Sequence, residues 1–292
     1  MKNYRLSLII PTLNAEKDIC PLIDSLKKQT IVPDEIIIVD SESEDATVET
    51  VRKYPEVRQI RIKRKKFDHG RTRDMALRKS GGDYVIFMTQ DALPKNRYMI
   101  EKLLEPFFRD EKVALSTGRQ LPKYDATRME QLVRRYNYPE TSRIRSKDDI
   151  AEMGIKAFFA SDVCAAYRRD IYEKLGGFDY PIKTNEDMFY AAKVIHSGYK
   201  IAYCADAEVL HSHNLSLKEQ YQRNYIQGYE IEKHKSVLGS GSQEAEGMKM
   251  VKYVSKELLK KGRVISFVHF GFDCCARLMG SKAGKKSANK RG

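Results

Sequence analysis

Polar residues that could bind a nucleotide or a cation follow three apolar runs in the first third of the chain. Thr12-Leu13-Asn14 follows the first run, Asp40-Ser41 the second and Gln90-Asp91 a later one. A carboxylate can accept hydrogen bonds from a base N–H or a ribose hydroxyl, and its oxygens are ligands that Mg²⁺ and Mn²⁺ prefer. Each aspartate alone could equally cap the turn that follows it. Two aspartates that each follow a strand of one parallel sheet favour a binding site over two separate turn caps.

Two further pairs, in the second half of the chain, could take part in chemistry. Glu186 and Asp187 open a helical segment, where acids complement the helix dipole, but a carboxylate there could also act as a general base. His211 and His213 alternate, so on a strand both side chains face the same way. Such a pair could bind a cation beside Asp91 or contact a diphosphate.

Arg71 and Arg73 stand just after Gly70, at the start of another helical segment. The planar guanidinium suits phosphate oxygens, and a helix N-terminus favours anions. We therefore expect these two arginines to contact a diphosphate. The alternative is that they belong to a solvated helix face.

Strands that alternate with helices would position these residues. The patterns predict strands at 6–10, 35–40, 57–62 and 84–88, with helices at 16–28, 47–53 and 71–79. Pro11 is expected to close the first strand. This alternation indicates an α/β fold with a parallel, doubly wound sheet, whose ligands bind at the carboxyl ends of the strands. The polar residues that follow the strands should therefore converge at one edge.

The rest of the chain is less regular. Strands are predicted at 113–118, 158–167 and 200–204, and helices at 96–109, 169–175 and 185–196. The polar, basic segment 128–149 shows no clear pattern, and we expect it to be mobile. A flexible joint, Gly239-Ser-Gly-Ser242, precedes basic helices at 248–259 and 264–279 and a tail rich in lysine, glycine and serine.

Composition narrows the class of protein. The 292 residues suit one large α/β domain with an appendage. Five scattered cysteines without a C-x-x-C pair favour a reducing cytosol over a disulfide framework or a zinc site. We find neither a secretory signal nor an apolar run of the roughly 20 residues that would span a bilayer. The net charge of +13 predicts an anionic partner.

Several of these segments resemble family 2 glycosyltransferases. The stretches 9–14, 36–47 and 82–91 resemble the nucleotide-binding half of that family, and Gly176-Gly-Phe-Asp179 and Thr184-Asn-Glu-Asp187 resemble its acceptor half. The resemblance covers residues 6–235. It implies the GT-A fold, a Rossmann-like and mostly parallel sheet. The catalytic domain would then span residues 1–235, divided into a nucleotide-sugar half (1–95) and an acceptor half (96–235).

The resemblance also implies roles for single residues. Asp40 would bind the base, Asp91 would be the remaining acid of a metal-binding D-x-D motif, and Asp187 would be the general base. Asp179 and Glu186 would contact the acceptor. The other residues implied to contact the nucleotide-sugar are Pro11, Thr12, Asn14, Arg71, Arg73 and Gln90.

The D-x-D motif is incomplete, because Thr89 replaces its first acid and Ala92 occupies the last position where an acid could stand. The expected Mg²⁺ or Mn²⁺ would then need help from His211 or His213. Thr89-Gln-Asp-Ala92, Phe67–Arg73 and His211-Ser-His213 resemble the bacterial rhamnosyltransferase branch, which uses dTDP-L-rhamnose. That resemblance implies an inverting hexosyltransferase. The alternatives are a UDP-hexose or UDP-GlcNAc transferase of the same fold and a non-catalytic protein that binds a nucleotide-sugar or a nucleic acid.

Residues 236–292 are expected to form a helical, basic extension. Val264–Phe272 is apolar, aromatic and flanked by lysines and arginines, which is typical of a helix lying on an anionic membrane. The alternatives are packing on the catalytic domain or on a second subunit, as in a homo-oligomer. We expect a cytoplasmic enzyme, peripheral on the inner face of the cell membrane. Its acceptor would be a lipid-linked saccharide in cell-surface polysaccharide synthesis. Aromatic residues do not interleave with the basic ones, so a nucleic-acid partner is not expected.

Overall fold

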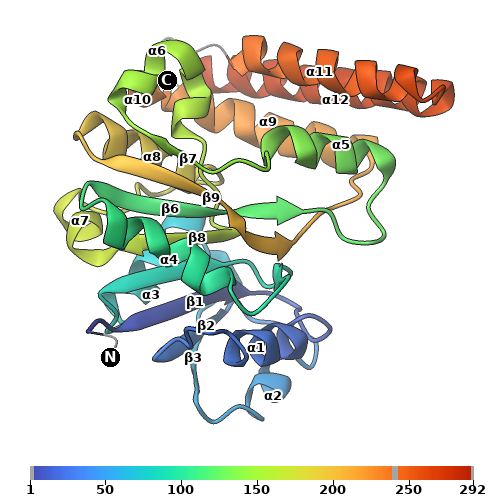
Figure 1. Ribbon diagram of the computed structural model, residues 1–292. Coiled ribbons are helices and arrows are strands. Elements are labelled where there is room, and N and C mark those ends of the chain that lie inside the picture. The colour runs from blue at the N-terminus through green and yellow to red at the C-terminus, as the bar shows by residue number, and fades with distance from the viewer. Residues whose placement is uncertain (1–2, 239–242, 291–292) are drawn as a thin grey trace.

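Nine strands form one sheet in the computed structural model, which describes residues 3–238 and 243–290 (Figure 1). The strand order is β3-β2-β1-β4-β8-β6-β9-β5, and β7 pairs with β9 from outside this path. Helices cover both faces of the sheet, and a layer of four helices, α5, α9, α11 and α12, lies beyond the β6 and β9 end (Figure 1). The bounds of these elements follow below.

The N-terminal strands are parallel, as the alternation of strands and helices predicts. They are β1 (Leu6–Thr12), β2 (Glu35–Asp40), β3 (Val57–Arg61) and β4 (Tyr84–Met88), joined through α1 (Ile19–Lys27), α2 (Thr47–Val51) and α3 (His69–Arg78). Strand β1 does not end at Pro11 as expected. It continues to Thr12, which is paired in register with Asp40 of β2. Two of the expected binding residues are thereby neighbours in the sheet.

The C-terminal half of the sheet is mixed. Strand β8 (Cys164–Arg168) runs antiparallel to β4 and to β6 (Val113–Leu121), whereas β6 and β9 (Lys200–Leu210) are parallel. The short strand β5 (Leu93–Pro94) is antiparallel to β9. Helices α4 (Met99–Arg109), α7 (Arg169–Lys174) and α8 (Glu186–His196) complete this half. The strand expected at 158–167 is wrong in its first part, because the 3-10 helix η3 (Gly154–Phe158) precedes a strand that begins only at Cys164.

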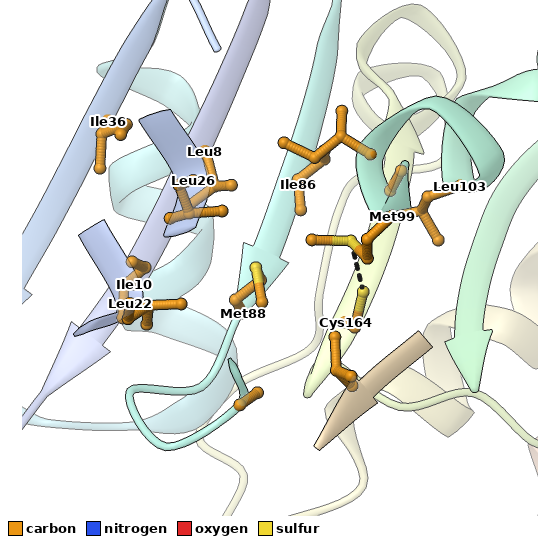
Figure 2. Close-up of a cluster of buried hydrophobic side chains, with 14 of the residues drawn as sticks. Leu8, Ile10, Leu22, Leu26, Ile36, Ile86, Met88, Met99, Leu103 and Cys164 are labelled. Carbon is orange, nitrogen blue, oxygen red and sulfur yellow. Dashed lines mark hydrogen bonds between the residues drawn. The ribbon is translucent and has the colours of Figure 1, made fainter. Parts of the chain in front are cut away.

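The core explains why the strand ends are held in fixed positions. Residues of β1 alternate between two clusters, since Leu8 and Ile10 pack on one face of the sheet and Ile9 on the other. Figure 2 shows the first cluster, where side chains of α1 and α4 cover the sheet and the Cys164 thiol lies 3.5 Å from the Met99 sulfur. Close packing on both faces leaves the strands little freedom to shift.

The expectation of a mobile, irregular segment at 128–149 is wrong. It contains α5 (Arg128–Asn137), β7 (Arg143–Arg145) and the 3-10 helix η2 (Lys147–Asp149), and α6 (Ile150–Met153) follows. The sequence pattern does not reveal this helix, because its charged residues pair with each other along the helix. Its few apolar residues pack against segments far away in the sequence. Glu130 and Arg134 lie 2.7 Å apart, and Leu132 and Val133 pack against the C-terminal helices.

Four helices end the chain, namely α9 (Leu217–Lys233), α10 (Lys235–Leu238), α11 (Gln243–Lys260) and α12 (Val264–Asn289). Helix α9 has no counterpart among the expected elements, and α12 extends beyond the predicted end at 279 into the tail rich in lysine, glycine and serine. The expected joint at 239–242 lies outside the described residues. A Cβ at Gly280 would collide with the carbonyl oxygen of Tyr221, and one at Gly284 with that of Tyr225, so glycines let α12 pack closely on α9. Among the described helices, none is sufficiently long and apolar to cross a bilayer.

Candidate active site

The polar residues after the parallel strands converge at one edge of the sheet, as predicted. The Thr12 hydroxyl lies 3.5 Å from an Asp40 carboxylate oxygen. The Gln90 side chain accepts a hydrogen bond from the Leu13 N–H (2.8 Å) and donates one to the Leu13 carbonyl (3.1 Å). The turns after β1, β2 and β4 are therefore joined to one another before any ligand binds.

Asp40 and Asn14 both shape the loop that follows β2. Buried Asp40 accepts hydrogen bonds from the backbone N–H and the hydroxyl of Ser43. Asn14, with a left-handed φ of 52°, accepts a hydrogen bond from the Glu44 N–H through its side-chain oxygen (2.9 Å). Pro11 lies in β1, paired in register with Val39 of β2. The expected roles of these residues in nucleotide binding stay predictions, and in the structure the Asp40 and Asn14 side chains hold the loop after β2 in place.

Asp91, His211 and His213 form a cluster with the geometry of a cation site. Pairing of Leu93 with Leu210 brings the turn after β4 next to the end of β9. The Nε2 atoms of both histidines lie 3.4 Å from one Asp91 oxygen, and candidate ligand atoms of all three residues lie within 4.8 Å of one another. The structure thus unites the incomplete D-x-D motif with the H-x-H pair.

Hydrogen bonds to Gln120 assign the tautomer of His211. The Gln120 side-chain oxygen faces the Arg134 guanidinium, which can only donate, so this atom must be the oxygen. His211 Nδ1 lies 2.9 Å from that oxygen and 3.3 Å from the guanidinium. The shorter contact requires a proton on Nδ1, which leaves the Nε2 lone pair directed at Asp91. A histidine that binds a metal through one nitrogen commonly donates the other N–H in this way.

The charges of this cluster suit a divalent cation. Burial lowers the pKa of His211 to about 4 and also lowers that of His213, so both rings are neutral at pH 7. Burial alone would raise the pKa of Asp91, but its contacts with His211 and His213 outweigh this and lower it. Neutral histidines bring no positive charge to the carboxylate, and the Lys123 ammonium lies 4.0 Å from an Asp91 oxygen. A cation bound through one oxygen and two nitrogens would supply positive charge, and Mn²⁺ accepts such mixed ligands.

A second cluster surrounds Asp187 at the first turn of α8. Its carboxylate accepts hydrogen bonds from the backbone N–H groups of Asp162 (3.0 Å) and Met188 (2.7 Å). Buried Arg73 pairs with Asp162 and with Glu186, each at 3.0 Å. The structure therefore brings Arg73 to Asp187 and Glu186, and its guanidinium is already engaged by two carboxylates.

This cluster favours protonation of its acids. Burial and, to a lesser extent, the charge of Glu186 raise the pKa of Asp187 to about 7, against the opposing hydrogen bonds and the charge of Arg73. Burial also raises the pKa of Asp162 and of Glu186. Three carboxylates share one guanidinium, and His69 cannot compensate because burial lowers its pKa to about 4. A carboxyl group with a pKa near 7 is suited to proton transfer.

Arg71 and Asp179 lie outside both clusters. The Arg71 guanidinium lies over the Tyr180 ring, 5.1 Å from its centre, and is exposed. Asp179 is exposed as well and pairs with Lys193 at 2.6 Å. Their expected contacts, with the diphosphate and the acceptor respectively, stay predictions.

Gln120 links the two clusters. Its side-chain nitrogen donates to the Ser161 hydroxyl at 2.9 Å, and the next residue, Asp162, donates its N–H to Asp187. The sequence analysis missed both Gln120 and Asp162. Gln120 lies in the last part of β6, beyond residue 118 where the strand was predicted to end. Asp162 lies within the predicted strand 158–167, whereas the observed strand begins only at Cys164.

Comparisons with known proteins find relatives of this chain. The sequence pattern of glycosyl transferase family 2 matches residues 7–176. The O-antigen chain rhamnosyltransferase RfbN of Salmonella typhimurium is 43% identical over 225 residues, which are 77% of this chain and 71% of that protein. The O-antigen chain rhamnosyltransferase WbaN of Salmonella anatum is 42% identical over 224 residues, 76% and 70% of the two chains.

Solved structures with the same fold include two glycosyltransferases. The mannosyltransferase PcManGT from Pyrobaculum calidifontis, in complex with GDP-Man and Mn²⁺, has a TM-score of 0.65 at 16% identity, covering 97% of this chain and 88% of that one. Residues 1–349 of TarS from Staphylococcus aureus, in complex with UDP-GlcNAc, have a TM-score of 0.55 at 18% identity, covering 97% and 92%. The fold is therefore GT-A, as expected.

Proposed function

The chain belongs to the family 2 glycosyltransferases, and on this premise we propose that it transfers L-rhamnose from dTDP-β-L-rhamnose to a lipid-linked saccharide. The product would be part of a cell-surface polysaccharide. The identity of more than 40% to two O-antigen rhamnosyltransferases, over three quarters of this chain, supports the choice of sugar. The observation that carries the mechanism is the pair of clusters around Asp91 and Asp187, linked through Gln120.

Asp187 is the residue we assign as general base. Its ionised carboxylate takes the proton of the acceptor hydroxyl while the hydroxyl oxygen attacks the anomeric carbon from the face opposite the diphosphate. A single displacement of this kind inverts the anomeric configuration, so a β-linked donor yields an α linkage. The Asp162 and Met188 N–H groups hold the carboxylate in one orientation, and Arg73 with Glu186 fixes the start of α8.

Asp91, His211 and His213 would hold Mg²⁺ or Mn²⁺, which neutralises the charge that develops on the leaving diphosphate. Two nitrogen ligands beside one carboxylate favour Mn²⁺ over Mg²⁺, which prefers oxygen. Thr12, Asn14 and Asp40 would line the nucleotide pocket, since they lie together at the carboxyl ends of β1 and β2.

Turnover of the purified protein with alternative donors tests this proposal. We expect dTDP-rhamnose to be consumed in the presence of Mn²⁺, and much less so after EDTA treatment. The runner-up is a UDP-GlcNAc or UDP-hexose transferase. It is favoured by a shorter match, 33% identity over 92 residues, to the poly(ribitol-phosphate) β-N-acetylglucosaminyltransferase TarS. Consumption of UDP-GlcNAc or UDP-glucose in preference to dTDP-rhamnose would replace the first proposal by the second.

We also propose that the enzyme works at the inner face of the cell membrane, held there by α12. Ile265, Val268, Phe272 and Met279 are exposed and lie on one stripe of the helix, opposite the face that packs on α9. At the same helical spacing, the stripe is followed by Lys286 and Lys290. An apolar stripe beside basic residues suits insertion into an anionic leaflet.

Vesicle co-sedimentation across a salt series separates this membrane proposal from its alternative. Ile265→Ser with Phe272→Ser should lose vesicle binding at high salt, where apolar insertion persists and charge attraction is screened. Binding equal to that of the parent protein would contradict the membrane proposal. A change from dimer to monomer in light scattering would assign the stripe to a subunit contact instead.

A further inference from the structure

A polar cavity of about 220 Å³ lies beside the H-x-H pair, between α5, α9 and α12. His213 forms one part of its wall, and Arg134, Arg223 and Arg277 come from the three helices. Figure 1 places these helices beyond β9, at the opposite end of the sheet from β1, β2 and β3. The cavity therefore adjoins the candidate cation site on the side away from the nucleotide crevice.

The charges that face the cavity are not balanced. Arg134 pairs with Glu130 at 2.7 Å, and Arg277 pairs with buried Asp273 at 2.5 Å. Arg223 forms no hydrogen bond or ion pair with any residue in the described ranges. Arg223 is exposed overall, yet partial burial lowers the pKa of its guanidinium, and the positive charges of Arg134 and Arg277 lower it further. An unpaired guanidinium beside two others is a site where an anion would be stabilised.

The close packing of α12 on α9 fixes this arrangement. Gly228 and Gly280 allow the two backbones to approach so closely that a Cβ at either position would collide with the other helix. The Tyr225 hydroxyl donates to, or accepts from, the Ser287 hydroxyl at 2.9 Å. Arg223 and Arg277 thus stand on two helices that cannot easily separate, so the positive charge is preorganised.

We propose that this cavity binds a phosphate or diphosphate group carried by the acceptor. The inference rests on the proposed function, in which the diphosphate of the donor lies at Asp91 and the nucleotide lies over β1 and β2. A second anion on the far side of His213 then belongs to the other substrate. Tyr138 and Phe159 line the cavity with their ring centres 5.6 Å apart, and Phe159 lies three residues before Asp162, whose N–H binds Asp187. An acceptor anchored here would reach the general base.

Titration of inorganic diphosphate tests the site without any need for turnover. With the donor pocket saturated by dTDP and Mg²⁺, the parent protein should still bind inorganic diphosphate. Arg223→Gln should weaken this binding about tenfold or more, the expected effect of losing a charged hydrogen bond. Arg135→Gln is the matched control, because exposed Arg135 follows Arg134 on α5 but does not line the cavity, and it should bind as the parent does. Absence of binding once the donor pocket is filled, or equal binding by Arg223→Gln, would overturn the proposal.

Kinetics then distinguish acceptor from donor. Arg223→Gln should raise the acceptor KM about tenfold for a diphosphate-linked saccharide, and should leave it unchanged for the same saccharide without phosphate. A higher KM for dTDP-rhamnose instead would assign the cavity to the diphosphate of the donor and overturn the proposal. If the parent protein turns over no dTDP-rhamnose, the proposed function fails, and the diphosphate titration still decides whether the cavity binds an anion.

Discussion

Asp91 and Asp187 are both partly buried aspartates, yet their surroundings move their pKa values in opposite directions. Contacts with two histidines lower the pKa of Asp91, whereas burial and Glu186 raise that of Asp187 to about 7. The first carboxylate stays ionised and can hold a cation. The second can exchange a proton near neutral pH. Environment rather than residue type thus divides the two roles, as in other enzymes with paired carboxylates.

The difference arises from what packs around each group. Next to Asp91 the end of β9 brings the ring nitrogens of His211 and His213, and Gln120 of β6 contacts the other nitrogen of His211. Around Asp187 the start of α8 and the segment before β8 bring two further carboxylates, and α3 contributes a single guanidinium. Substitutions at each centre should therefore have effects of different kinds.

Asp187→Asn should have the largest effect and should abolish transfer, by at least about a thousandfold in kcat. The amide cannot take the proton of the acceptor, but it keeps the shape of the side chain. Donor affinity, measured by calorimetry, should stay within a few-fold of the parent, because the base acts on the other substrate. Retained turnover in the purified variant would remove Asp187 from the mechanism.

Asp91→Ala should reduce kcat/KM by about a hundredfold or more, and should make donor binding insensitive to EDTA. Asp40→Ala is the matched comparison, since it should weaken nucleotide binding yet keep the response to chelator. Calorimetric titration of the donor with and without Mn²⁺ measures both. If chelation changes neither binding nor turnover in the parent protein, the cation assignment at Asp91 is wrong.

The nucleotide side of this comparison was predictable because its residues follow strands that alternate regularly with helices. Thr12, Asp40 and Asp91 were placed at one edge by that rule alone, and the structure places them there. The H-x-H pair was recognised from its alternation, and a short pairing of β5 with β9 brings it to Asp91. The positions of these residues follow from the local hydrophobic pattern and from the parallel arrangement of the strands.

The base side was less predictable because it depends on contacts between distant segments. Asp162 comes close to Asp187 only because β8 begins after it, and the hydrophobic pattern does not mark that boundary. Helix α5 looks irregular in sequence since its partners, Val254 and Phe270, lie more than a hundred residues later. Arg73 was expected at a diphosphate because a helix start suits anions, and the structure instead surrounds it with carboxylates.

Gln120 offers a way to separate the two centres. Gln120→Glu keeps an acceptor for His211 and Arg134 but loses the donor to Ser161, whereas Gln120→Leu loses both. We expect Gln120→Leu to weaken Mn²⁺ affinity about tenfold to a hundredfold, the usual effect of losing the partner of a ligand histidine. Gln120→Glu should keep Mn²⁺ affinity and lower kcat.

Measurement of Mn²⁺ binding and of kcat in both variants checks this separation. Thermal unfolding of each variant serves as the control for a general loss of stability, because Gln120 is buried. Equal losses of Mn²⁺ affinity in Gln120→Glu and Gln120→Leu would contradict the tautomer assigned to His211.

Glu186→Gln should have the smallest effect, a shift in the pH profile. Asp187 must be ionised to take a proton, so kcat/KM should rise with pH and reach half of its plateau near pH 7, the pKa of this group. Glu186 raises that pKa through its negative charge, and it also holds Arg73 at 3.0 Å. Removal of this charge stabilises the ionised form of Asp187, so the midpoint should fall by about one pH unit. The variant would then work closer to its plateau at pH 6 than the parent does.

Gln can still accept the hydrogen bond from Arg73, so the fold should be retained, and circular dichroism at pH 6 and 8 checks this. Glu101→Gln, an exchange of the same kind in α4, far from the cluster, should leave the midpoint in place. A midpoint that stays near pH 7 or rises in Glu186→Gln would show that Glu186 does not tune the base.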